Sequence, residues 1–214
     1  MVSLNLIKEE KNNVTIFPKG EYILKICHTV NAHEDFVDKF GGYINTYVLE
    51  DIPEYLVARF YELREISIIE RNADVYLPHN EFMENLAKSE IIYGYTSIFF
   101  PEYIDTFLEF AKKGKEIGII VSEDVINAII EYYQDNLEFG LKYKNVNFYV
   151  SDRNMRYSFI VTDKLFSISF FMKNGIFDYK RDFICSTRDC IRWGTDLFNY
   201  VRENSTKIDI GKLK

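Results

Sequence analysis

Apolar residues recur every three to four positions in some parts of the chain, and they alternate with polar residues or cluster in others. The helical spacing predicts helices that begin near Glu21, cover residues 53–63, follow Pro78, and cover residues 103–113, 123–139 and 189–203. The alternating or continuous apolar runs predict strands at residues 65–71, 91–100, 117–121, 146–150, 157–162, 166–172 and 176–179. Strands that alternate with helices predict an α/β fold. We expect a mainly parallel sheet flanked by helices, with an antiparallel C-terminal hairpin.

Local signals sharpen three of these boundaries. Ser122, followed by two acidic residues, is a typical start for the helix over residues 123–139. The Asn174-Gly175 pair favours a hairpin with a type I′ turn. Two adjacent glycines, Gly41 and Gly42, are expected to end or bend the segment that follows the helix beginning near Glu21.

A short hairpin is predicted near the N-terminus, because apolar residues in segments 6–10 and 14–17 flank a polar Lys-Asn-Asn turn. Four side chains around it carry donors that could contact phosphates, as the wing of a winged helix does: Lys8, Lys11, Asn12 and Lys19. The alternative is that they are ordinary solvated residues of a turn.

The composition limits the partners. With a net charge of −7 and a pI near 5.1, the chain does not attract nucleic acid through its overall field, so DNA contact would need a local basic patch. The start of the chain has no apolar signal region, and the apolar run at residues 91–100 is too short and too polar to span a bilayer. We therefore expect a cytoplasmic protein without membrane contact.

Catalytic and metal-binding patterns are missing from the sequence. Three cysteines without a CxxC pair argue against a disulfide framework and a structural zinc site, which leaves Cys185 and Cys190 as core or surface thiols. The three histidines, His28, His33 and His79, occur in no HExxH frame, and no GxSxG, Walker or GxGxxG motif is present. We expect no catalytic residue, no metal and no cofactor.

Several blocks of the chain, in order, resemble the middle domain of the methanogenesis regulatory protein family of archaeal winged-helix regulators. The blocks are residues 51–56, 73–82, 96–103, 159–164 and 174–182, and the similarity covers about residues 50–202. The resemblance implies an N-terminal winged helix-turn-helix joined to this domain, and segment 6–22 looks like the end of that headpiece. A winged helix needs three helices before its wing. Since about five residues precede the hairpin, we expect that the recognition helix is not encoded in this chain. We expect DNA binding only where a complete headpiece is present.

The domain is also distantly similar to TrmB-like sensor domains and, through them, to phospholipase D, whose signature is HxKxxxxD. Aligning Asp163 with the acid puts Arg156 at the histidine position and Ser158 at the lysine position. An arginine that stays protonated cannot attack phosphorus as histidine does, so we expect a degenerate phospholipase D-like fold that keeps its crevice and lacks the chemistry.

The predicted ligand site lies beyond the carboxyl ends of the parallel strands, where ligands bind in open α/β sheets. Its candidate residues are Tyr76, His79, Tyr95, Ser97, Ser122, Arg156, Ser158 and Arg181. The guanidinium of Arg156 or Arg181 could hold a carboxylate or phosphate in a bidentate pair, which would suit an anionic effector. The alternative is that both arginines pair with nearby acids such as Asp163 or Asp182.

These observations predict a wing-like hairpin over residues 1–22, a linker and dimerisation helix over 23–50, an α/β sensor domain over 51–204 and a tail over 205–214. The predicted function is that of a homodimeric transcriptional regulator that senses a small molecule and is not an enzyme. Two alternatives stay open: a phospholipase D-like phosphodiesterase, and a protein-interaction module that dimerises through its aromatic-rich helices without a ligand.

Overall fold

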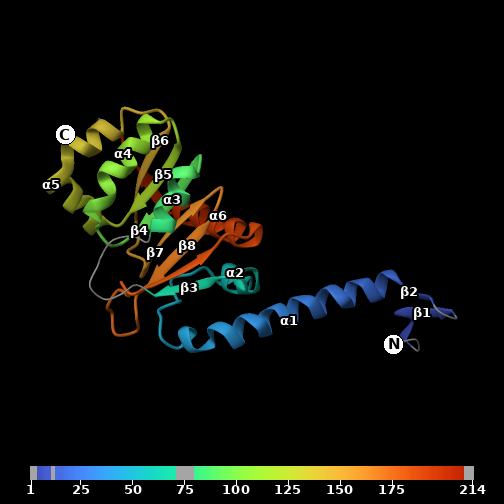
Figure 1. Cartoon of the computed structure of the whole chain (residues 1–214). Coiled ribbons are helices and arrows are strands. Elements are labelled where there is room, and N and C mark those ends of the chain that lie inside the picture. The colour runs from blue at the N-terminus through green and yellow to red at the C-terminus, as the bar shows by residue number, and fades with distance from the viewer. Residues whose placement is uncertain (1–3, 11–12, 71–79, 210–214) are drawn as a thin grey trace.

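The computed structural model describes residues 4–10, 13–70 and 80–209. Strands β1 (Ile7–Glu10) and β2 (Asn13–Ile16) form an antiparallel hairpin, as predicted, and α1 (Pro18–Ile44) follows it. In Figure 1, α1 extends away from the α/β unit and carries the hairpin at its far end. The helix starts earlier than predicted because a proline suits the first helical turn, and the two glycines near its end do not interrupt it.

The α/β unit contains one sheet with the strand order β10-β6-β5-β4-β7-β8-β9-β3. Its strands are β3 (Ser67–Glu70), β4 (Ile91–Thr96), β5 (Glu116–Val121), β6 (Val146–Ser151), β7 (Tyr157–Thr162), β8 (Phe166–Phe170), β9 (Arg181–Cys185) and β10 (Ser205–Lys207). The prediction of a mainly parallel sheet is wrong, because only β4–β5 and β5–β6 are parallel pairs and the other described pairs are antiparallel. The predicted first strand, now β3, lies at the far edge and runs antiparallel to β9. The sheet is therefore mixed, and β10, inside the predicted tail, closes its other edge.

The parallel part follows its local sequence signals closely. Helices α4 (Ile104–Lys112) and α5 (Glu123–Gly140) connect its three strands, after a short 3-10 turn, η3 (Pro101–Tyr103). The Ser122 side chain accepts a hydrogen bond from the Val125 amide at 3.4 Å and so caps α5. Gly114, with φ +82°, follows α4 in a conformation that disfavours other residues.

The antiparallel part differs from prediction at its turn. Asn174 keeps a negative φ and only Gly175 is positive, at +84°, whereas a type I′ turn needs positive φ at both positions. The Gly175 amide donates to the Met172 carbonyl at 2.8 Å, and the Met172 amide donates to the Ile176 carbonyl at 2.8 Å. This is a three-residue loop that ends in a left-handed glycine. Its return strand makes a single bridge before β9 begins.

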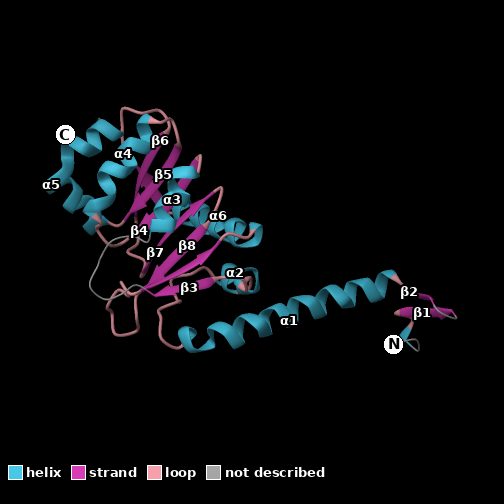
Figure 2. Ribbon diagram, viewed as in Figure 1, coloured by secondary structure: helices cyan, strands magenta, loops and turns pink. Residues whose placement is uncertain are grey.

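Helices cover both faces of the sheet (Figure 2). On one face α6 (Arg188–Glu203) packs with the end of α1, with α2 (Glu54–Val57) and with the 3-10 helix η2 (Phe60–Leu63). The single helix predicted over residues 53–63 is thus divided into α2 and η2. The Trp193 indole, fully buried, donates to the Leu56 carbonyl at 3.0 Å. The opposite face is covered by α3 (Asn80–Lys88), α4 and α5. Because side chains alternate along each strand, neighbouring residues of β7 and β8 point to opposite faces of the sheet, one toward α6 and the next toward α4 and α5.

One covalent feature contradicts the sequence prediction. Cys185, at the end of β9, and Cys190, in the first turn of α6, form a disulfide across a Cα–Cα distance of 6.1 Å. The odd cysteine count argued against a disulfide framework and left both residues as thiols, but the tight turn capped by Thr187 brings this pair together. Cys27 is exposed on α1.

Candidate ligand pocket

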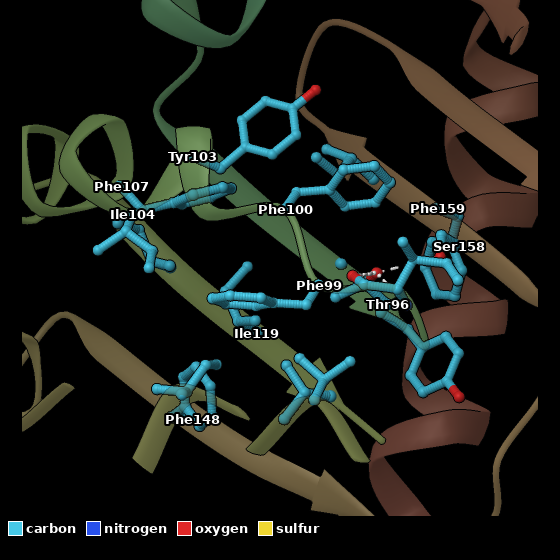
Figure 3. Close-up of a pocket in the computed structure, with 18 of the residues that line it drawn as sticks. Thr96, Phe99, Phe100, Tyr103, Ile104, Phe107, Ile119, Phe148, Ser158 and Phe159 are labelled. Carbon is cyan, nitrogen blue, oxygen red and sulfur yellow. Dashed lines mark hydrogen bonds between the residues drawn. The ribbon is translucent and has the colours of Figure 1, made fainter. Parts of the chain in front are cut away.

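A cavity of about 230 Å³ lies between the sheet and the helices α4 and α5 (Figure 3). Its sides are mostly apolar and rich in aromatic rings. The rings belong to Phe82, Phe99, Phe100, Tyr103, Phe107, Tyr133, Phe148, Phe177 and Tyr179, among others. In Figure 3, Phe99 lies near the centre, with Ile119 and Phe148 on one side and Phe100, Tyr103 and Phe107 on the other. A largely apolar hollow with a few converging polar groups is typical of a small-molecule site.

The polar groups of the cavity form a row across four adjacent strands. Thr96 of β4 lies opposite Ser158 of β7, and their hydroxyl oxygens are 3.1 Å apart. Ser158 is the cross-strand partner of Ser169 on β8. The Ser169 hydroxyl donates to a carboxylate oxygen of Asp182 on β9 at 2.5 Å. All four residues line the cavity. We call Thr96, Ser158, Ser169 and Asp182 the polar row.

The hydrogen bonds within the polar row fix where its hydroxyl protons point. Thr96 donates to the Ile98 carbonyl at 2.6 Å and accepts from the Ile98 amide at 3.0 Å. Its one proton is therefore used, so in the contact with Ser158 it is Thr96 that accepts. Ser158 donates to Thr96 and Ser169 donates to Asp182, which leaves oxygen lone pairs of both serines as acceptors. Ser167, two residues before Ser169 on β8, adds a hydroxyl to the same face.

Among the described residues, the charged groups that border the cavity are acidic. Asp182 is 9 % exposed, and Asp178 is 4 % exposed and accepts from the Tyr47 hydroxyl at 2.5 Å. Burial, together with this bond, raises the pKa of Tyr47 to about 12. Asp178 also pairs with the Arg181 guanidinium at 3.1 Å. Among the lining residues that the structure describes there is no lysine, arginine or histidine.

Two of the predicted ligand residues, Tyr95 and Ser158, line this cavity. Tyr95 is 1 % exposed, and its hydroxyl accepts from the Met155 amide at 2.9 Å. Its side chain belongs to the core cluster under α6, and this burial raises its pKa to about 12. Ser97 donates to the Tyr157 carbonyl at 3.3 Å, and Ser122 is occupied as the cap of α5. Neither of these two serines borders the cavity.

Both predicted arginines are held in ion pairs. Arg156 forms a bidentate pair with Asp51, with Nε–Oδ2 and Nη2–Oδ1 distances of 2.8 and 3.1 Å. Burial opposes the charge of Asp51, but the bonds from Arg156 hold the pKa of that carboxyl below its ordinary value. Arg181 pairs with Glu70 at 3.0 Å in addition to Asp178. The pairing alternative is thus confirmed, but with partners other than the predicted Asp163 and Asp182.

The remaining sequence candidates lie elsewhere. Lys8 pairs with Glu10 across a 2.5 Å contact in the hairpin, and Lys19 is exposed in the first turn of α1. Four candidates lie outside the described residues: Lys11, Asn12, Tyr76 and His79.

The three positions of the phospholipase D signature are not brought together. Ser158 borders the cavity, Arg156 pairs with Asp51, and Asp163 accepts from the Glu90 amide at 3.0 Å, next to the start of β4. The cavity reaches Thr96, at the opposite end of β4. Within residues 4–10, 13–70 and 80–209, no cluster of three or more His, Cys, Asp or Glu side chains could hold a metal ion. In the same ranges, no helix is long and apolar enough to cross a bilayer.

Sequence reasoning missed the polar row beyond Ser158. The signal was present in β8, whose sequence Phe-Ser-Ile-Ser-Phe places both serines on one face of the strand. Asp182 becomes part of the row only through the register of β8 with β9.

Comparison with known families identifies the domain. Residues 75–204 match the family described as the middle domain of methanogenesis regulatory protein FilR1. FilR1 of Methanothrix harundinacea (strain 6Ac) is 19 % identical over 198 residues, which cover 90 % of this chain and 43 % of that protein. The chain therefore spans less than half the length of this relative.

Two solved structures show a similar fold. TrmBL2, described as an archaeal chromatin protein with a novel mode of DNA binding, superposes with a TM-score of 0.53 at 9 % identity, over 97 % of this chain and 79 % of that one. Nuc, a phospholipase D family member from Salmonella typhimurium, superposes with a TM-score of 0.50 at 8 % identity, over 67 % of this chain and 97 % of that one. At these identities the likeness shows the fold alone.

Proposed function

The chain belongs to the family of the FilR1 middle domain, and we propose that it is the effector-binding and dimerising part of a transcriptional regulator. The observation that carries this proposal is the aromatic cavity with its polar row, where the described residues assemble no hydrolytic site. A bound molecule there would contact both the sheet and the helices α4 and α5. It could shift the regulator between two states if its affinity differs between them.

The geometry argues against the phosphodiesterase alternative. Covalent attack on phosphorus needs a histidine or a comparable nucleophile beside the acid. The described lining offers hydroxyls, the side-chain amide of Asn136 and carboxylates, with no basic group to stabilise a phosphoryl transition state.

Helix α1 supports a dimeric arrangement. Ile23, Ile26, Val30 and Val37 are all exposed and follow the spacing of a heptad seam. Phe40 continues this face into the core of the α/β unit, where it packs on Phe36 with a ring-centroid distance of 5.1 Å. Pairing of two α1 helices along this seam would bury the exposed side chains and bring the two hairpins near each other.

DNA recognition in this proposal belongs to a complete winged helix-turn-helix, with the hairpin as its wing. Lys8, Lys11, Asn12 and Lys19 stay candidate phosphate contacts. By itself the chain is acidic, and Lys8 is already paired with Glu10. We therefore expect weak DNA binding by this chain alone at physiological salt.

The test joins this chain to the part of the Methanothrix harundinacea relative that it does not match, and selects binding sites from a random DNA library. The joined form should enrich a defined sequence, and the chain alone should enrich none. Anisotropy titrations at 150 mM salt then compare the affinities for the enriched sequence. The proposal fails if the joined form selects no sequence, or if the chain alone binds DNA as tightly as the joined form.

A further inference from the structure

We propose that the loop between β8 and β9 transmits occupation of the cavity to helix α1, and that Asp178 is the positioning residue that joins the two. The loop covers residues 171–180, and we call it the coupling loop. The inference rests on the proposed effector-binding role and adds to it the route by which a bound molecule acts. Three observations carry it: the loop borders the cavity, it holds the end of α1, and one carboxylate takes part in both contacts.

The coupling loop forms part of the cavity wall. Phe177, Asp178 and Tyr179 are among the lining residues. The Phe177 ring is 7 % exposed and packs against the ring of Phe100, which also lines the cavity, with a centroid distance of 6.2 Å. A molecule that fills the cavity would therefore contact the coupling loop as well as α4 and α5.

The coupling loop also holds the chain just beyond α1. The Lys173 amide donates to the Thr46 carbonyl at 2.9 Å, and the Val48 amide donates to the Phe171 carbonyl at 2.9 Å. Figure 1 shows the loop beside the segment that leaves α1. Because these bonds join the two backbones directly, a displacement of the loop is passed to the base of α1.

Asp178 connects the two contacts. It lines the cavity, and its Oδ2 atom accepts from the Tyr47 hydroxyl at 2.5 Å and from Nη1 of Arg181 at 3.1 Å. Its Oδ1 atom accepts from the Lys180 amide at 2.9 Å. Tyr47 is 2 % exposed, and its ring stacks on that of Tyr43 in the last turn of α1. Since a buried hydrogen bond is costly to leave unmade, the carboxylate and Tyr47 move together.

Helix α1 would amplify a small movement at its base. Its last turns pack into the core through Phe36 and Phe40. From Phe36 back to Pro18 the helix rises about 27 Å, at about 1.5 Å per residue, so a tilt of about 10° would move its start by about 5 Å. The hairpin follows this movement, because the Phe17 amide donates to the Leu6 carbonyl at 3.0 Å. In a dimer, the spacing of the two hairpins would change.

The experiment fills the cavity with toluene and follows the Val48 amide by hydrogen exchange in NMR spectra of the full chain. Toluene suits the lining, because a dry apolar cavity of about 150 Å³ takes up benzene and this cavity has about 230 Å³. Any ligand slows exchange by stabilising the fold, so the Ala58 amide, bonded within α2, reports this general effect. We expect toluene to slow the Val48 amide at least about threefold more than the Ala58 amide, because the bound ring restrains the coupling loop.

Tyr47→Phe separates the coupling from the binding. The variant loses the hydroxyl that bonds to Asp178 and keeps the ring, and Tyr47 is not among the lining residues. By isothermal titration calorimetry it should bind toluene within about twofold of the unmodified chain, while the extra slowing of Val48 disappears. A merely structural role of Tyr47 would change exchange in the free chain and keep the response to toluene. Tyr55→Phe, which removes an exposed hydroxyl on the α6 face of the sheet, is the matched control and should keep both binding and response.

A further variant places the binding in this cavity. Ile119→Trp should fill the space and abolish both the binding of toluene and the response of Val48. Ile104→Trp serves the same purpose if the first variant does not fold by circular dichroism.

The inference is overturned if toluene slows Val48 no more than Ala58, if Tyr47→Phe keeps the full response, or if the filled variant binds toluene like the unmodified chain. It is also overturned if the unmodified chain binds no toluene at millimolar concentration, because the cavity then admits no apolar ligand. None of these measurements involves DNA, so each of these results leaves the DNA selection open to succeed. Failure of that selection would remove the proposed function and leave the measured coupling intact.

Discussion

Gly194 of α6 offers a sharp test of how tightly the helix packs on the sheet. A Cβ atom at this position would lie 2.9 Å from Cε2 of Phe166, and closer still to Cδ2 of the same ring. Phe166 on β8 is fully buried between Trp193 and Phe159, so its ring has no space to move. Gly194→Ala therefore forces α6 away from the sheet or pushes the ring from its rotamer.

The expected magnitude follows from two opposing effects. Overpacking in a filled core costs about 1–3 kcal/mol, and alanine returns about 1 kcal/mol of helix propensity relative to glycine. Since the ring of Phe166 is fixed, we expect a net loss of about 1–2 kcal/mol of unfolding free energy. For a chain of 214 residues this corresponds to a fall in Tm of about 2–4 °C per kcal/mol.

The matched control is the same substitution at Gly42, a helical residue of α1 around which a Cβ would meet nothing within 4 Å. There only the propensity effect remains, so Gly42→Ala should stabilise the chain by about 0.5–1 kcal/mol. Urea denaturation followed by circular dichroism measures both variants. A Gly194→Ala variant as stable as the unmodified chain would refute the close packing of α6 on β8.

Two further predictions concern α1 and the pair between Asp51 and Arg156. Ile26→Asp places a charge in the exposed apolar seam of α1, so in sedimentation velocity it should convert a dimer into a 25.4 kDa monomer. The control variant Asn31→Asp adds the same charge off the seam and should stay dimeric. A monomeric unmodified chain would contradict the dimer. The pKa of Asp51 is lowered in the folded state, so its ionised form stabilises the fold above its ordinary pKa, and this contribution is lost as the pH falls through the lowered value. Because Arg156 is half exposed, Asp51→Asn should lower the free energy of unfolding by only about 0.2–1 kcal/mol at pH 7. This difference in unfolding free energy between the variant and the unmodified chain should vanish at pH values below the lowered pKa. A difference that does not depend on pH would contradict an ionic contribution.

The elements that the sequence predicts well are those defined by local chemistry. The cap at Ser122, the amphipathic faces of α5 and α6, and the limits of β7 depend on residues next to one another in the chain. Strand order is a different kind of information. Nothing local to segment 67–70 distinguishes a first parallel strand from an edge strand that pairs with β9, more than 110 residues later. The mainly parallel sheet was therefore an error of pairing, while the strand itself was predicted correctly.

The same limitation explains why an anionic site was inferred. Arginine has the chemistry to hold an anion, but whether it does so depends on which acids the fold places beside it. Asp51 lies 105 residues from Arg156, and Glu70 lies 111 residues from Arg181. Both guanidinium groups form ion pairs with residues that no local sequence pattern identifies.

The polar row shows the reverse case. Its serines have no distinctive sequence pattern, and the register of four strands places them in a line of hydrogen-bond acceptors. Ser158 belongs to both accounts, because it occupies the lysine position of the phospholipase D signature and is also the centre of that row. A hydroxyl at this position cannot supply the positive charge that a lysine would offer to a phosphate group.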